Sequence, residues 1–98
     1  MNIEKEFAGS AHVMKVSGRL DTTTAPALEA AVSEAIGGCE QLILDFAGLE
    51  YISSAGLRVI LKAQKSMAAK GGMIIKNVNE TIMEIFEITG FSDILTIE

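Results

Sequence analysis

Short apolar runs alternate along the chain with longer segments in which apolar residues recur every three or four positions. The short runs have the length and spacing of β-strands. They cover residues 12–16, 42–46, 73–75 and 94–97. A less regular strand is expected around Ile3 and Phe7, before a turn at Gly9 and Ser10. The pattern therefore predicts about five strands.

Small residues mark the expected ends of two of these strands. The first run should stop at Ser17 and Gly18, and the run 42–46 should end in a turn formed by Ala47 and Gly48. The run 42–46 is apolar on both faces, which predicts a strand that is covered from both sides.

Three longer segments carry the helical period. The first, residues 24–36, follows threonines that can cap it, has Pro26 in its first turn, and ends at Gly37 and Gly38. The second is expected at residues 53–70, where two further glycines close it. Each of these segments is long enough to form a helix that packs against a sheet through a single apolar stripe.

The apolar stripe of each helix defines the face that should pack inward. In the second helix this face is expected to hold Leu57, Ile60, Leu61, Gln64, Met67 and Ala68. The third helix should begin after a capping Asn79, pack through Ile82, Ile85 and Phe86, and end at Gly90.

Length and composition agree with one compact domain. The chain has 98 residues, of which 49% are hydrophobic and only 5% aromatic, so an aliphatic core is expected. Strands and helices alternate without repeats or linkers. We therefore predict an α/β fold, a single domain covering residues 1–98, with a mixed and mostly parallel sheet of about four to five strands and helices packed against it.

Charge and cysteine content exclude several classes of function. The net charge is −5, which disfavours binding to the phosphate backbone of nucleic acids. Cys39 is the only cysteine, so no internal disulfide can form, and we expect it to be a small apolar residue at the start of a strand. The N-terminus is charged and the apolar runs are far shorter than the ~20 residues of a membrane span. We therefore expect a cytoplasmic protein without membrane insertion.

Groups that could carry out catalysis are scarce. His12 is the only histidine, and we expect it to be a partly exposed strand residue. The sequence has no Gly-x-Ser-x-Gly elbow, no phosphate-binding glycine loop and no cluster with metal-ligand spacing. We therefore expect no catalytic residue, no metal and no cofactor. A small enzyme that uses Ser54 as its nucleophile is the least favoured alternative.

One segment, Asp45–Leu57, leads from a buried strand to small polar residues at a helix start. Ser53 is placed to cap the helix, which leaves Ser54 exposed in its first turn. Gly56 costs a helix roughly 0.5–1 kcal/mol relative to alanine, which indicates that something approaches the backbone closely there. Capping alone would explain the two serines. A phosphate on Ser54, however, would suit the helix dipole and would add about −1.5 to −2 charges, repelling a docked partner without unfolding the domain.

The same segment, Asp45–Leu57, resembles the signature of STAS domains, and in particular that of the anti-sigma factor antagonists. Gly18–Thr22 resembles the loop before the first helix of this family, and Ile85–Phe91 resembles the segment before its last strand. The three matches occur in the family's order and cover nearly the whole chain. The resemblance implies the family's small mixed sheet with helices packed against it.

The resemblance also implies a binding switch that is controlled by phosphorylation. In antagonists of this family, an anti-sigma factor that is also a serine kinase phosphorylates a serine at the start of the second helix. The unphosphorylated form binds that kinase and releases a sigma factor, and a metal-dependent serine phosphatase resets the cycle. The match places the phosphorylation site at Ser54, with Ser53 as the alternative because many antagonists have aspartate there. The expected partner-binding residues are Asp21, Thr22, Glu50, Ser53, Ser54, Gly56 and Leu57.

Other roles of STAS domains are alternatives. The chain could be an accessory subunit of a lipid-transporting ABC permease, or a scaffold in a sensory complex. The sequence leaves the sigma factor, the pathway and the oligomeric state open.

Overall fold

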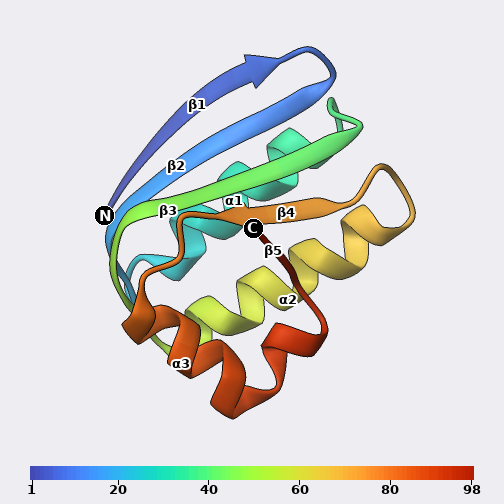
Figure 1. The fold of residues 1–98 in the computed structure, drawn as a ribbon. Coiled ribbons are helices and arrows are strands. Elements are labelled where there is room, and N and C mark those ends of the chain that lie inside the picture. Colours follow the sequence, from blue (N-terminus) through green and yellow to red (C-terminus); the bar gives the residue numbers. More distant parts are fainter.

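The computed structural model describes residues 1–98 and contains one five-stranded sheet with three α-helices and a short 3₁₀ helix (Figure 1). The elements are β1 (Asn2–Ala8), β2 (Ala11–Leu20), α1 (Ala25–Ile36), β3 (Gln41–Ile52), α2 (Ser54–Ala68), β4 (Met73–Lys76), α3 (Glu80–Thr89), η1 (Phe91–Asp93) and β5 (Thr96–Ile97). The strand order is β1-β2-β3-β4-β5, in which β1 and β2 are antiparallel and every other pair is parallel. The predicted α/β class and mostly parallel mixed sheet are confirmed.

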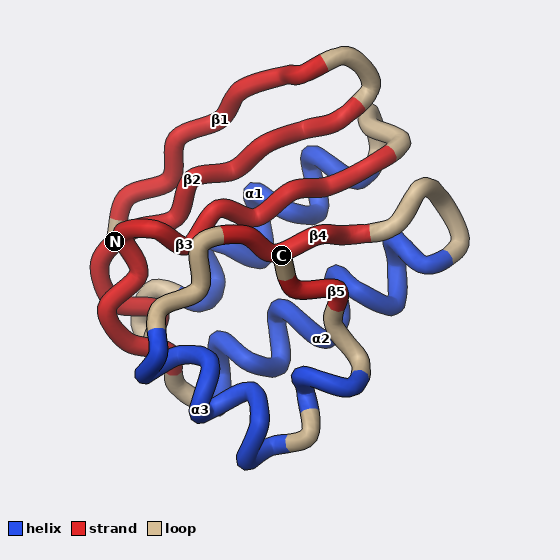
Figure 2. The backbone as a smooth tube through the Cα atoms, viewed as in Figure 1, coloured by secondary structure: helices blue, strands red, loops and turns tan.

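The helices cover one face of the sheet, and this differs from the two-sided coverage expected for β3. α1 and α2 lie side by side against the sheet (Figures 1 and 2). Burial alternates along the strands, so that Leu44 and Ile75 are completely buried beneath the helices. Ile43 and Asp45 on the opposite face are only half-buried. Asp45 is held there by bonds that its carboxylate accepts from Asn77 Nδ2 and from the Ala47 N–H, both at 3.0 Å.

Strands β1, β2 and β3 are longer than the sequence pattern predicts, whereas the last strand, expected over 94–97, is limited to Thr96–Ile97. All seven residues of β1 pair with β2. β2 continues past Gly18 to Leu20, and β3 continues through Ala47 and Gly48 to Ile52, where a turn was expected. The pairing of β2 with β3 shifts its register within this extension. Gly48 is paired with Ser17 there, and a Cβ on Gly48 would lie only 2.7 Å from the Cβ of Ser17. The glycine thus permits close strand approach at an irregularity and does not form a turn.

The ends of α3 follow the predicted signals. Asn79 caps the helix, accepting a bond from the Ile82 N–H at 2.9 Å, and Gly90 ends it in the left-handed conformation with φ of 82°. Asn79 also donates through Nδ2 to the Leu49 C=O at 2.8 Å, which ties α3 to β3. Ile82 and Phe86 are buried as predicted, and Ile85 is half-buried.

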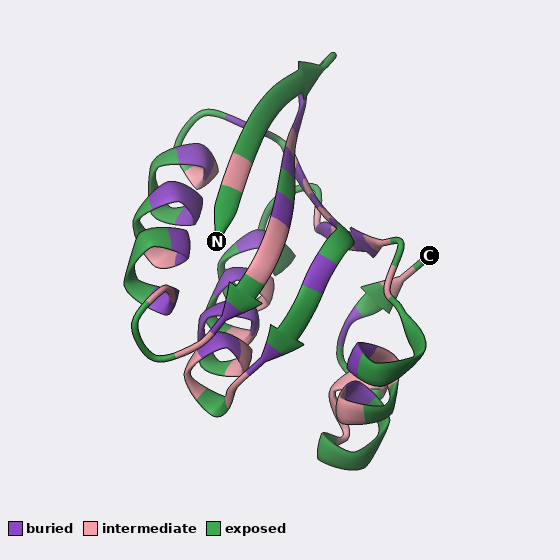
Figure 3. Cartoon of the chain, turned by 90° about the vertical axis from the view of Figure 1, so that its left-hand side faces the viewer, coloured by how far each residue is buried: buried purple, intermediate pink, exposed green.

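The burial of Cys39, His12 and the inner face of α2 differs in part from what the sequence predicts. Cys39 is a buried residue, as expected of a small apolar side chain, but it lies just before β3, which begins at Gln41, and not at the start of the strand itself. His12 is also buried, with only 6% of its surface exposed, so the expectation of a partly exposed residue is wrong. In α2, Val59 and Ala63 are buried where Leu61 and Ala68 were expected, because the buried stripe of this helix is turned towards α1 (Figure 3).

Candidate functional site

The candidate site lies where the end of β2 meets the start of α2. The Ser53 N–H donates a 2.9 Å hydrogen bond to the Leu20 C=O. The next residue after Leu20, Asp21, opens the loop that leads to α1. This bond therefore joins two segments that the sequence analysis singled out, Gly18–Thr22 and Asp45–Leu57.

The two adjacent serines have different environments. Ser53 caps α2 as predicted, because its Oγ accepts the Gly56 N–H at 3.4 Å, and the residue is half-buried. Ser54 is the first residue of α2 and its side chain is exposed. The hydroxyl that a modifying enzyme could reach most directly is therefore that of Ser54.

The Asp21 carboxylate is engaged by its own loop. Its Oδ1 accepts hydrogen bonds from the Thr23 hydroxyl at 2.7 Å, the Thr23 N–H at 3.0 Å and the Thr24 N–H at 3.2 Å. The Thr23 hydroxyl is the largest influence that holds the pKa of Asp21 below its ordinary value, because these donors favour the charged form. The loop beside Ser54 is therefore organised around a negative charge.

A threonine was expected to cap α1 through its side chain, and that expectation is wrong. Thr24 occupies the N-cap position without a side-chain capping bond. Its hydroxyl instead accepts the Asp21 N–H and donates to the Arg19 C=O, both at 2.8 Å. Thr24 thus closes the loop back onto β2 and fixes the start of α1 relative to the sheet.

The close approach predicted at Gly56 is made by the chain itself. Gly56 is buried, and a Cβ at this position would lie 2.6 Å from Cγ of Leu20 and 3.0 Å from Cγ1 of Ile52. The first turn of α2 therefore packs directly on the end of β2. This contact accounts for the glycine without a partner protein.

The other residues expected to contact a partner differ in exposure. Thr22 and Glu50 are exposed, whereas Leu57 is half-buried. Beside them, the guanidinium of Arg19 lies over the ring of Tyr51, 4.2 Å from its centroid. The sequence carries no local signal for this pair, because only the register of β2 and β3 brings the two residues together.

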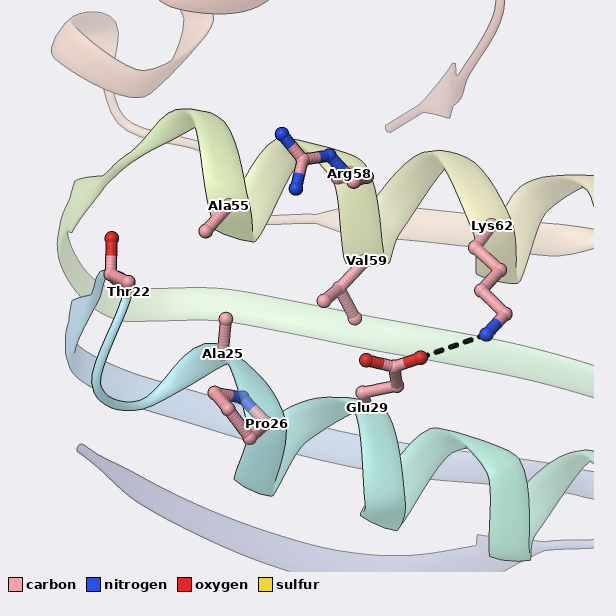
Figure 4. A pocket seen from close by; sticks show the side chains of 8 residues that line it. All are labelled: Thr22, Ala25, Pro26, Glu29, Ala55, Arg58, Val59 and Lys62. Carbon is pink, nitrogen blue, oxygen red and sulfur yellow. Dashed lines mark hydrogen bonds and ion pairs between the residues drawn. The ribbon is translucent and has the colours of Figure 1, made fainter.

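A shallow groove of about 280 Å³ separates the first turns of α1 and α2 (Figure 4). It is lined by Thr22, Ala25, Pro26, Glu29, Ala55, Arg58, Val59 and Lys62. Lys62 donates to Glu29 across it at 2.8 Å, whereas Arg58 projects from α2 away from α1. Sequence reasoning missed this groove, although the spacing of Ala55, Arg58, Val59 and Lys62 already places them on one side of a helix.

The site lacks the partners that a catalytic serine would use. His12 lies near the start of β2, about 26 Å along that strand from the end where Ser54 lies. No group of three or more histidine, cysteine, aspartate or glutamate side chains could hold a metal ion. None of the helices is both long and apolar enough to cross a membrane.

Comparison with protein families gives a match over nearly the whole chain, because the STAS domain model covers residues 2–98. The chain belongs to the STAS domain family. Two similar proteins are anti-sigma factor antagonists, which confirms the predicted resemblance. The anti-sigma F factor antagonist of Paenibacillus polymyxa is 31% identical over 100 residues, covering 99% of this chain and 86% of the relative. The anti-sigma-B factor antagonist of Listeria monocytogenes is 33% identical over 86 residues, covering 85% of this chain and 75% of the relative.

Solved structures with the same fold include further regulatory proteins of bacteria, among them an anti-sigma factor antagonist. An anti-sigma factor antagonist from Mycobacterium paratuberculosis superposes with a TM-score of 0.90 at 23% identity, covering 98% of this chain and 83% of that chain. The phosphorylated form of SpoIIAA from Bacillus superposes with a TM-score of 0.77 at 23% identity, covering 99% and 91%. At these identities the similarity establishes that the STAS fold is shared.

Proposed function

We propose that this STAS protein is an anti-sigma factor antagonist whose binding surface is switched by phosphorylation of Ser54. The observation that carries the proposal is the exposed hydroxyl of Ser54, at the first position of α2 and beside the Asp21 loop. The antagonists among its relatives support the class of function. In this proposal the unmodified form acts in the cytoplasm by binding an anti-sigma factor serine kinase, which releases a sigma factor.

Local geometry favours Ser54 over Ser53 as the modified residue. The Ser53 hydroxyl accepts a bond from the helix backbone, and its residue is half-buried. Phosphorylation of Ser53 would replace the capping oxygen of α2, whereas phosphorylation of Ser54 leaves that cap in place.

A phosphate on Ser54 should leave the fold intact. At the first position of α2 it meets the positive end of the helix dipole. Arg58, four residues further along the helix, is exposed and near enough in helical spacing to approach the phosphate. The modification therefore changes the charge of the surface while the domain stays folded.

The proposed partner surface surrounds Ser54. It comprises the exposed Thr22 and Glu50, the half-buried Leu57 and the groove between α1 and α2. Asp21 and Gly56 contribute by holding the loop and the helix start in position, through hydrogen bonds and close packing respectively. A partner docked over this surface would have to desolvate the phosphate, which would weaken the complex. A metal-dependent serine phosphatase would restore the unmodified surface.

A binding titration tests this proposal. Purified protein and its Ser54→Asp variant are titrated against the anti-sigma factor kinase encoded in the same genome. A loss of about 2–3 kcal/mol would weaken binding roughly thirty- to more than a hundredfold. Ser66→Asp is the matched control, because Ser66 is exposed near the other end of α2. Equal affinity of all three proteins, or a large loss of thermal stability in Ser54→Asp, would contradict the proposal.

Mass spectrometry of the protein captured from its host locates the modification. The tryptic peptide Leu20–Arg58 contains both serines, and fragmentation separates them. Phosphate on Ser54 is the expected result. An unmodified peptide recovered together with ATPase or permease subunits would instead favour the accessory role in transport.

A further inference from the structure

β1 (Asn2–Ala8) leaves one side of its backbone free. All seven of its residues pair with β2, and no strand lies on its other side (Figures 1 and 2). The strand contains no proline, and its register with β2 is continuous. Such an edge can accept an extended segment of another chain through backbone hydrogen bonds.

A pocket of about 240 Å³ lies beside this edge, between β1, the start of β2 and the C-terminal half of α1. Lys5, Phe7, His12 and Glu34 contribute to its walls. Phe7 is 72% exposed, although it lies on the helix-covered face of the sheet, and its ring is 4.6 Å from that of His12. An exposed aromatic side chain beside a pocket is a common feature of binding surfaces.

The wall of this pocket also contains a polar atom without a partner. His12 is 6% exposed, and its Nε2 is buried without a hydrogen bond. An unsatisfied buried polar atom costs stability, and such atoms are rare in folded proteins. The pocket wall beside the free strand edge is therefore not fully satisfied by the hydrogen bonds of the chain itself.

The charges of β1 oppose pairing with a second copy of the chain. In an antiparallel pair of strands, opposite residues point to the same face of the sheet. Every antiparallel register of two β1 strands that aligns the charged stretch therefore sets Glu4 or Glu6 against a glutamate, or Lys5 against a lysine. Like charges placed opposite one another are destabilising.

We propose that β1 is the docking strand for an extended segment of a partner protein that carries basic residues at alternate positions. Glu4 and Glu6 lie on one face of β1 and would face those basic residues. Lys5 and Phe7 lie on the other face. There the segment would place an acidic residue opposite Lys5 and an apolar side chain beside Phe7, over the pocket.

This surface is separate from the one around Ser54. The pocket lies at the start of β2, and Ser54 lies beyond the end of that strand, about 26 Å away along it. Glu4, which is paired with Lys15, is nearer, about 17 Å from the same end. The proposal therefore does not depend on phosphorylation, and both surfaces could be occupied at once.

A peptide titration followed by nuclear magnetic resonance tests the proposal. The probe is the blocked peptide Thr-Leu-Lys-Glu-Lys-Ile-Thr, and the matched control Thr-Leu-Glu-Lys-Glu-Ile-Thr reverses its three charges. We expect amide shifts confined to β1 and the end of α1, with binding of the probe about tenfold tighter than that of the control. Equal binding of both peptides, shifts elsewhere, or no shifts at millimolar peptide would overturn the proposal.

Two variants of the protein complete the test. Phe7→Ala should fold normally, because the side chain is mostly exposed, and should weaken probe binding. The double variant Glu4→Lys and Glu6→Lys should reverse the preference, so that the control peptide becomes the better ligand. Circular dichroism checks that both variants fold, and a folded double variant that still prefers the probe would overturn the charge assignment.

Discussion

At the residue scale, Gly56 sets how closely α2 approaches β2. Replacement by alanine would favour the helix intrinsically by up to about 1 kcal/mol. The added Cβ would, however, lie 2.6 Å from Cγ of the fully buried Leu20, and such overpacking costs about 1–3 kcal/mol. We therefore expect Gly56→Ala to lower the free energy of unfolding by about 1–2 kcal/mol, the cost of overpacking outweighing the gain in helix propensity.

Urea denaturation measures this difference. Gly38→Ala is the control, because a Cβ there would meet no atom within 4 Å. If Gly56→Ala were as stable as the unchanged protein, the close packing of α2 on Leu20 would not be the reason for the glycine.

Asp21 should make stability depend on pH in the acid range. Its pKa in the folded protein lies below the ordinary value of 3.8, chiefly because the Thr23 hydroxyl donates to the carboxylate. Since the folded-state pKa is the lower one, this stabilisation is fully present above 3.8 and is lost as the pH falls through the folded-state pKa. Asp21→Asn should therefore lower the melting temperature at pH 7 and differ less from the unchanged protein near pH 3.

Thr23→Val separates the hydroxyl from the rest of the loop. It removes the strongest donor to Asp21 but keeps both backbone donors, so its pH-dependent loss should be smaller than that of Asp21→Asn. Melting curves of the three proteins across this pH range provide the measurement. A constant difference between Asp21→Asn and the unchanged protein at every pH would contradict the argument.

At the scale of elements, the two side-chain caps should differ in strength. Asn79 accepts the Ile82 N–H at 2.9 Å and also donates to β3, whereas the bond from the Gly56 N–H to Ser53 is 3.4 Å long. We expect Asn79→Ala to cost about 1–2 kcal/mol of unfolding free energy and Ser53→Ala about 0.5 kcal/mol. Chemical denaturation of the two variants gives both values. A larger loss of unfolding free energy in Ser53→Ala than in Asn79→Ala would show that bond length does not determine the strength of these caps.

Local signals made these caps predictable, whereas contacts between elements were not. Ser53, Asn79 and Gly90 act through neighbouring backbone groups, so their residue types and positions were sufficient. The buried stripe of α2 was predicted from its own apolar residues. Packing against α1 instead buries Val59 and Ala63, and nothing in α2 alone specifies that neighbour.

In the candidate site, too, the local features were predictable from the sequence and the contacts between elements were not. A family resemblance predicted that Ser54 and the Asp21 loop belong to one partner surface, and in the structure the Ser53–Leu20 bond brings these two segments close together. The resemblance gave no indication that Leu20 is the group that approaches Gly56, because the two residues meet only in the folded sheet.

At the scale of the whole molecule, the helices cover only one face of the sheet, so the other face is open, and the edge formed by β1 is open as well. Alternation of strands and helices predicted the sheet but did not determine how the helices would be distributed over its faces. The half-buried Ile43 and Asp45 lie on the open face. β1 forms the open edge (Figure 1). These exposed regions are where a small domain can add a second binding surface without disturbing its core.

The two proposed binding surfaces should act independently. Along β2, the pocket beside β1 lies about 26 Å from the Leu20 end where Ser54 lies, and Glu4, which is paired with Lys15, lies about 17 Å from that end. The shorter of these distances is about twice the screening length of about 8 Å at physiological salt, so a charge at Ser54 should have little direct effect on the charges of β1. We expect the Ser54→Asp variant to bind the peptide Thr-Leu-Lys-Glu-Lys-Ile-Thr with a Kd within about twofold of the unchanged protein, since distant sites couple by only about 0.3–0.5 kcal/mol. Calorimetric titration of both proteins tests this expectation. A change of about tenfold in this Kd would contradict the expectation and would correspond to about 1.4 kcal/mol of coupling between the two surfaces. Because coupling is reciprocal, peptide binding at β1 would then have to alter partner binding at Ser54 by the same factor.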